Sequence, residues 1–221
     1  DANGQNITIG QALLHSTIIG DNGIDGGLTT VGNGGGTVTL TGVNTYTGPT
    51  TINGSNTLAI VAPYSTLGSS VLVTNGGRLK VTASPSSSVL PTMTLNDGSG
   101  IAFDLGTYNP ANVPGITNAN LNVSGTNVID VAGGSFPVAS ITLLAYTNKT
   151  GTGVFELGTL SPGVVATLTD TGSNLVLNLA VTNTSTALTL SVGSNPSAFG
   201  DRLTFQAAVS PAPPDGAIIT F

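Results

Sequence analysis

The stretch Gly34–Ile60, GGGTVTLTGVNTYTGPTTINGSNTLAI, decides the fold that the sequence predicts. Val38 and Leu40 alternate with threonines, which is the two-residue period of a strand with one buried face. The following segment, Gly42–Pro49, is rich in residues that favour turns. A second strand begins at Thr50, and its alternation resumes after an Asn-Gly bend. The stretch therefore predicts strand, turn, strand.

Corners rich in Asn, Asp, Ser and Gly recur along the chain at a nearly constant spacing. Steps of 20, 22, 22 and 27 residues separate the corner glycines Gly34, Gly54, Gly76, Gly98 and Gly125, and the longest step holds an insertion at Tyr108–Gly115. Glycine suits such corners because it readily adopts a positive φ. One coil cannot bury its apolar edge alone, whereas stacked coils share a core. The period therefore predicts an all-β parallel β-solenoid with one coil per repeat.

The segment Thr39–Gly54, TLTGVNTYTGPTTING, resembles the autotransporter-associated β-strand repeat of bacterial surface proteins. The resemblance implies a right-handed parallel β-helix displayed outside the cell. It implies no enzymatic activity.

The remaining sequence suggests a division into parts. We expect a β-solenoid domain over 1–181, consisting of a cap at 1–27 with a helical turn at Gln11–Ser16, regular coils at 28–125 and a less regular terminal part at 126–181. A polar linker at 182–185 follows. The last part, 186–221, resembles the opening three strands of a bacterial Ig-like repeat. An Ig-like sandwich needs about seven strands over ~100 residues, so this part predicts an incomplete module.

Further strands are expected in the second half of the solenoid domain. They are Leu121–Val123, Val128–Val131, Ile141–Tyr146, Val154–Leu157, Val164–Leu168 and Leu175–Val181.

Composition excludes several classes of function. The 221 residues carry a net charge of −6, and the four basic residues are Arg78, Lys80, Lys149 and Arg202. These cannot build a basic groove for nucleic acid or a polybasic membrane patch. Cysteine is absent, which excludes disulfides and thiolate metal sites. No apolar run approaches the ~18 residues of a membrane helix. The first residue is Asp1 and no leader follows, so we expect a removed signal peptide or an excerpted fragment.

Strand alternation predicts which side chains face outward. Leu79 and Val81 should point inward, so their charged neighbours should point outward. The expected outward charges are Arg78, Lys80, Asp104, Asp130 and Glu156. Clustering of Lys80, Asp104 and Asp130 would favour a polysaccharide-cleaving enzyme. The alternative is a set of isolated charges that keep a long sheet soluble.

Two polar candidates lie in the first 27 residues. A Ser-His-Asp triad would have to use His15, the only histidine, but no G-x-S-x-G motif presents a serine, so we expect a structural histidine. The segment from Asp21 to Gly26 partly matches a calcium loop. Its third and twelfth positions are glycine, which excludes an EF-hand and leaves Asp21 and Asp25 as a looser calcium candidate.

Neither phosphate binding nor a cofactor is predicted, because the glycine run Gly32–Gly36 is not followed by Lys-Ser/Thr or a helix. A sugar-binding strip is a further hypothesis, since exposed aromatic side chains bind glycans. Its four candidate residues are Tyr46, Tyr64, Tyr108 and Tyr146, although Tyr46 and Tyr64 lie near corners where aromatics ordinarily cover the core.

These observations favour a structural, non-enzymatic protein of the bacterial cell surface that assembles with copies of itself into a fibre, stalk or surface layer. Assembly would use open strand edges, or strand complementation by the incomplete Ig-like part. The residues expected to assemble are Ala187, Leu188, Leu190, Leu203, Phe205, Ile218 and Phe221. The alternative is an adhesin that binds a glycan or a host surface, and the third hypothesis is the polysaccharide-degrading enzyme.

Overall fold

The computed structural model describes residues 4–61, 70–82, 87–106, 113–133, 140–180, 185–193, 197–202 and 204–210. Within these residues every regular element is a β-strand, so the all-β prediction is confirmed. No helix in this described part is long and apolar enough to cross a membrane. The chain divides into two compact units, Asp1–Leu179 and Ala180–Phe221.

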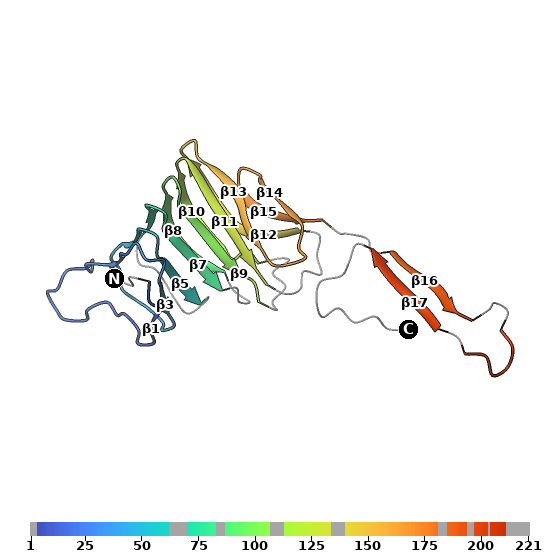
Figure 1. The fold of residues 1–221 in the computed structure, drawn as a ribbon. Coiled ribbons are helices and arrows are strands. Elements are labelled where there is room, and N and C mark those ends of the chain that lie inside the picture. The colour runs from blue at the N-terminus through green and yellow to red at the C-terminus, as the bar shows by residue number, and fades with distance from the viewer. Residues whose placement is uncertain are drawn as a thin grey trace. The chain divides into compact units, whose positions relative to one another are not determined.

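The first unit contains a seven-stranded sheet in which every pair of neighbours is parallel (Figure 1). Its strands, in spatial order, are β1 (Ile7–Ile9), β3 (Thr37–Leu40), β5 (Thr57–Val61), β7 (Arg78–Thr82), β9 (Gly100–Asp104), β11 (Thr126–Ala132) and β13 (Val154–Leu160).

The second sheet of this unit has eight strands and is mixed. In spatial order its strands are β2 (Leu28–Thr30), β4 (Thr50–Asn53), β6 (Val71–Thr74), β8 (Ser88–Leu95), β10 (Ile116–Val123), β12 (Ser140–Thr150), β15 (Asn174–Leu179) and β14 (Ala166–Asp170). The strands from β2 to β12 pair in parallel, whereas β15 is antiparallel to both of its neighbours. From β2 to β13, successive strands of the chain alternate between the two sheets.

Apolar residues from successive strands pair directly and form the core. In the seven-stranded sheet Val38 pairs with Leu58, Leu58 with Leu79, and Leu79 with Ile101. All four side chains are buried. Ile101 then pairs with Ile129 after a longer step of 28 residues. The predicted alternation and the longer step are therefore both present.

The prediction of a right-handed parallel β-solenoid is wrong. The finding that overturns it is the pair of separate sheets, one parallel and one mixed, in which β15 runs against the strands beside it. A short turn causes the reversal: the backbone N–H of Thr171 donates to the carbonyl of Asn174, and Gly172 has a φ of 89°. So short a connection can join only antiparallel strands.

The predicted partial Ig-like sandwich is wrong as well. The described residues of the second unit form a single two-stranded antiparallel sheet of β16 (Ser185–Val192) and β17 (Thr204–Ser210), and no second sheet packs on it within those residues. The third expected strand, Gly216–Phe221, lies outside the described residues. The helical turn expected at Gln11–Ser16 is also absent, and this segment belongs to an irregular loop.

Four of the five corner glycines adopt a positive φ, as predicted. They are Gly54, Gly76, Gly98 and Gly125, with φ between 61° and 84°. The fifth corner differs because Gly35, rather than Gly34, has the positive φ. At Gly54 a side chain is excluded a second time, since a Cβ would lie 2.4 Å from the carbonyl oxygen of Gly32.

Candidate functional site

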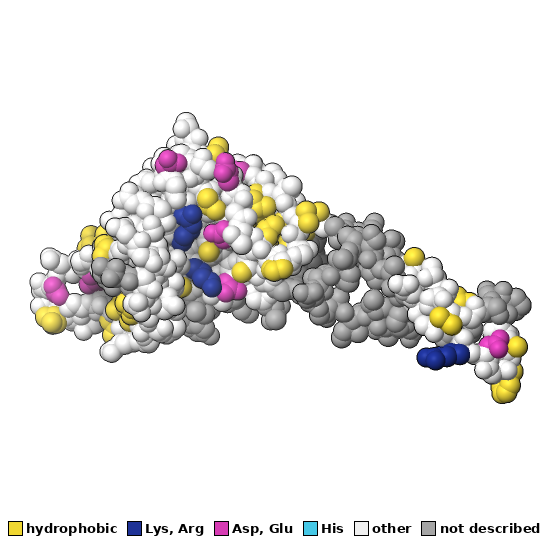
Figure 2. Space-filling view, viewed as in Figure 1, with side chains coloured by type: hydrophobic (Ala, Val, Ile, Leu, Met, Phe, Trp, Pro, Cys, Tyr) yellow, Lys and Arg dark blue, Asp and Glu magenta, His cyan; other side chains and the backbone are white. Residues whose placement is uncertain are grey.

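The outward face of the seven-stranded sheet carries the charges that alternation placed there. Leu79 and Val81 on β7 are fully buried, and Arg78 and Lys80, which alternate with them, reach the opposite face. Basic, acidic and apolar side chains lie together on this face (Figure 2). Glu156 on β13 is exposed at the outer strand of the same sheet.

Two ion pairs connect the charges on this face. Lys80 Nζ lies 3.0 Å from Asp104 Oδ2, and Arg78 Nε lies 3.8 Å from Asp130 Oδ2. The other carboxylate oxygen of Asp130 accepts a hydrogen bond of 2.7 Å from the backbone N–H of Thr159. The cluster thus ties β7, β9, β11 and β13 together across the sheet.

Small residues on the intervening strands leave room for these long side chains. On β9, Gly100 pairs with Arg78 of β7, and Ala102 pairs with Lys80. A Cβ on Gly158 would lie 2.3 Å from the Asp130 carboxylate, so the glycine on β13 leaves space for the Asp130 side chain. Arg78 can therefore reach across β9 to a carboxylate on β11.

A hollow of about 340 Å³ opens on this face, and we call it the trough. Its polar wall includes Lys80, Asp130 and Thr159. Its apolar wall includes Ala102, Ala132 and Leu160, and it extends to Pro162 in the turn after β13. The trough therefore crosses four strands and reaches the edge of the sheet.

The enzyme hypothesis required Lys80, Asp104 and Asp130 to lie near one another, and the structure brings them together. Lys80 contacts Asp104 directly and lines the same hollow as Asp130. Each of these charges also has a protein partner, which is what a structural role requires. The arrangement can hold a polar ligand, and it can equally fix neighbouring strands.

An 18-residue loop, 10–27, connects β1 to β2 and is held at its base by hydrogen bonds. The backbone N–H of Leu13 donates to Asn44 Oδ1 at 2.8 Å, and the carbonyl of Leu13 accepts from the N–H groups of Thr45 and Tyr46. Connections of this length are uncommon in compact domains and are often functional.

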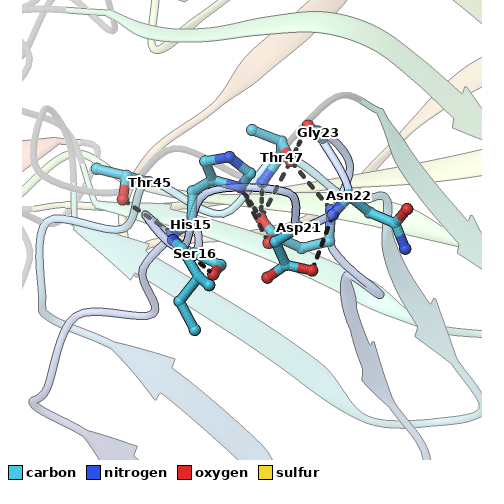
Figure 3. A network of polar contacts seen from close by, with 9 residues as sticks. His15, Ser16, Asp21, Asn22, Gly23, Thr45 and Thr47 are labelled. Atoms are coloured by element: carbon cyan, nitrogen blue, oxygen red, sulfur yellow. Dashed lines mark hydrogen bonds and ion pairs between the residues drawn. The ribbon is translucent and has the colours of Figure 1, made fainter.

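His15, Asp25 and Thr47 form a network that we call the loop latch (Figure 3). His15 Nδ1 lies 3.0 Å from Asp25 Oδ1, which joins the two arms of the loop. Asp25 Oδ2 accepts a hydrogen bond of 2.6 Å from the backbone N–H of Thr47, and Thr47 Oγ1 accepts one of 3.1 Å from the N–H of Asp25. The backbone hydrogen bond from Thr47, aided by contacts with His15, lowers the pKa of Asp25 from 3.8 to about 2.

The two aspartates of the calcium candidate are engaged by protein groups. Both oxygens of Asp25 belong to the loop latch, and Asp21 Oδ1 accepts a hydrogen bond of 2.8 Å from the N–H of Asn22. Among the described residues no three His, Cys, Asp or Glu side chains lie close enough together to hold a metal ion. The pairing of His15 with Asp25 was not predicted, although the turn cluster between them could have suggested that the chain folds back.

The loop beyond the latch carries exposed apolar side chains. We call Ser16–Ile24, which lies between His15 and Asp25, the tip. Ile18 and Ile19 are 75% and 102% exposed, and Ile24 is exposed as well. Leu14, just before His15, is also exposed. A sequence pattern does not reveal these four residues, because they follow neither a strand nor a helix period.

Two of the four tyrosines in the predicted sugar-binding strip are buried. The hydroxyl of Tyr46 lies 2.7 Å from Thr50 Oγ1, and that of Tyr146 donates to Asp170. Tyr64 and Tyr108 lie outside the described residues. A strip of four exposed rings is therefore not present.

The predicted assembly residues belong to the second unit. Ala187 and Leu190 lie on β16, and Phe205 on β17 is 57% exposed and pairs with Leu190. Leu188 also lies on β16. The other three residues, Leu203, Ile218 and Phe221, lie outside the described part of the chain.

Comparison of the chain with protein-family models, curated proteins and solved structures finds no match.

Proposed function

We propose that this chain is a structural protein of the bacterial cell surface that joins with copies of itself to build a fibre, stalk or surface layer. The observation that carries the proposal is the pair of open edges on the seven-stranded sheet. The resemblance of Thr39–Gly54 to a repeat of bacterial surface proteins supports the extracellular location.

The two edge strands of this sheet have compatible directions. All six pairs from β1 to β13 are parallel, so both edge strands run the same way. Neither edge strand has a partner on its outer side within the described residues. A copy placed head to tail could therefore continue the ladder, and such a contact repeats without closing and gives a filament.

The β1 edge carries no charge and no proline, but it is only three residues long. Its sequence is Ile7-Thr8-Ile9, and Ile7 is partly exposed. Natural edge strands are commonly protected by short length, lysine, proline or a bulge. The absence of a charge and of proline on β1 favours its use as a contact surface.

The two-stranded sheet of the second unit offers another contact. Leu190 and Phe205 form a cross-strand pair, and Phe205 and Val192 are more than half exposed. An isolated two-stranded sheet is only marginally stable in water. Its addition to the open edge of a neighbouring copy would stabilise it, which is the strand-complementation route.

Electron microscopy and light scattering of the purified chain test the proposal. We expect filaments with a regular axial repeat, and a particle mass that rises with concentration. The double variant Ile7→Lys/Thr8→Pro should shorten or abolish them, because it adds a charge and removes a backbone donor on β1. Val43→Lys, at an exposed turn position, is the matched control. A wild-type chain that stays monomeric at high concentration would refute the proposal.

The enzyme remains a second candidate because Lys80 pairs with Asp104 and lines the trough together with Asp130. Release of reducing ends from a panel of acidic and neutral polysaccharides would support it, provided that Asp130→Asn abolishes the release. The adhesin hypothesis is less favoured, since two of its four tyrosines are buried. A glycan array without hits would count against it.

A further inference from the structure

We propose that the apolar tip of the loop between β1 and β2 inserts into the trough of a neighbouring copy. This inference rests on the proposed self-assembly and names the surfaces that would make the joint. It concerns Ser16–Ile24 on one copy and the hollow along β7 to β13 on the next.

The tip has the character of a preformed binding element. Ile18 and Ile19 expose 75% and 102% of their surface. Neighbouring exposed apolar side chains often mark a site where a partner binds. The loop latch joins the two arms of the loop below the tip through His15 and Asp25. Because the base is already fixed, less conformational entropy is lost on binding.

The trough has the matching chemistry. Ala102, Ala132, Leu160 and Pro162 give it an apolar wall, and the two ion pairs around Lys80 and Asp130 lie beside that wall. Its volume of about 340 Å³ exceeds that of one large aliphatic side chain. Burial of the two isoleucine side chains would favour association, because it removes apolar surface from water.

The loop points away from the trough of its own copy. It projects beyond β1, away from the other strands (Figure 1), whereas the trough begins at β7 and ends at β13 and the turn that follows it. With strand spacings of about 4.8 Å, roughly 14 Å separate β1 from β7 and roughly 29 Å separate β1 from β13. A second copy joined at the β13 edge brings a tip to the trough without a reversal of the loop.

The proposed joint between copies brings the two surfaces together. A neighbour whose β1 extends the seven-stranded sheet at β13 carries its loop after β1 to the edge at which the trough ends.

Disulfide trapping tests the joint, because the chain contains no cysteine. The double variant Ile19→Cys/Ala132→Cys places one thiol on the tip and one in the trough. We expect mild oxidation of the assembled protein to give a ladder of covalent oligomers on a non-reducing gel. Reductant should remove the ladder. Each single variant should give dimers at most.

A matched control pairs the same tip thiol with a distant exposed position. Ile19→Cys/Val89→Cys carries its second thiol on the eight-stranded sheet, where the side chain is 70% exposed. We expect at least tenfold less oligomer from this variant. We also expect Ile18→Ser/Ile19→Ser to raise the concentration needed for assembly at least tenfold, with unchanged β-sheet circular dichroism.

The outcomes separate the inference from the proposed function. Assembly without a tip-to-trough ladder, or an equal ladder from the Val89→Cys control, would overturn the inference and leave self-assembly standing. A chain that never assembles would overturn both. Binding of monomers to phosphatidylcholine vesicles, lost in Ile18→Ser/Ile19→Ser and without any ladder, would overturn the inference and assign the tip to a lipid surface.

Discussion

The carboxylate of Asp25 accepts a hydrogen bond of 2.6 Å from the backbone N–H of Thr47, 22 residues later in the chain. This contact ties the loop between β1 and β2 to the turn between β3 and β4. It also holds the loop's second arm against His15. The irregular N-terminal loop is thus attached to the regular strands by side-chain chemistry rather than by strand pairing.

The Asp25 contact predicts how the loop responds to acid. The pKa of Asp25 is lowered from 3.8 to about 2, so the carboxylate stabilises the folded loop fully above pH 3.8, and this contribution is lost as the pH falls towards 2. We expect carboxyl NMR shifts of Asp25 to titrate near pH 2. Asp25→Asn should accelerate amide exchange of Thr47 at neutral pH. Asp21→Asn, whose carboxylate interacts with Ser16 and Asn22 within the tip, should leave that exchange unchanged.

Gly100 should tolerate no side chain. A Cβ there would lie 2.0 Å from the carbonyl oxygen of Val128, so Gly100→Ala should lower the free energy of unfolding by about 3 kcal/mol. Gly98→Ala is the control, because its Cβ meets nothing and only the φ of 74° opposes it, at a cost of about 1 kcal/mol. Urea unfolding measures both. Equal losses would show that the contact with β11 does not matter.

Arg78 should contribute more to stability than Lys80. Arg78 Nη1 lies 3.3, 3.1 and 3.0 Å from the carbonyl oxygens of Gly76, Gly77 and Gly98, in addition to its ion pair. We expect Arg78→Ala to lower the free energy of unfolding by about 2 kcal/mol, since hydrogen bonds to a charged group are strong. Lys80→Ala removes one partly exposed ion pair and should cost less than about 1 kcal/mol. The reverse order in urea unfolding would contradict this reading.

Two buried tyrosines predict a loss of stability in alkali. Burial raises the pKa of Tyr46 despite its hydrogen bond with Thr50, and burial together with the neighbouring Asp170 raises the pKa of Tyr146. A phenol with a raised pKa stabilises the fold fully below pH 10, and this contribution is lost as the pH rises further. Thermal unfolding at pH 8 to 11 should show the decline. Tyr46→Phe/Tyr146→Phe should make it shallower, and an unchanged slope would refute the assignment.

The pKa of Asp170 is shifted in the opposite direction to the pKa values of the two tyrosines. Burial alone would raise its pKa, but hydrogen bonds from Lys149, Tyr146 and the N–H of Gly172 outweigh burial and lower it. Lys149 Nζ lies 2.5 Å from the carboxylate and 5.1 Å from the centre of the Phe155 ring. The only basic residue on the eight-stranded sheet thus stabilises the turn at which the chain direction reverses.

Much of the candidate site followed from alternation alone. The inward Leu79 and Val81 fixed the outward direction of Arg78 and Lys80, because successive side chains of a strand point to opposite faces. The partners of these cations could not be predicted in the same way. Whether Arg78 meets Asp130 depends on the register of three strands and on the space that Gly100 leaves.

The sequence by itself determined the all-β class, the position of most strands, the glycine corners and the apolar core, because each depends on local alternation or local backbone geometry. Only the tertiary structure decided the separation into a parallel and a mixed sheet, the reversal at β15, the His15–Asp25 contact and the exposed tip. These features depend on which segments pair across long separations and on which apolar residues remain uncovered. A local pattern does not specify either of them.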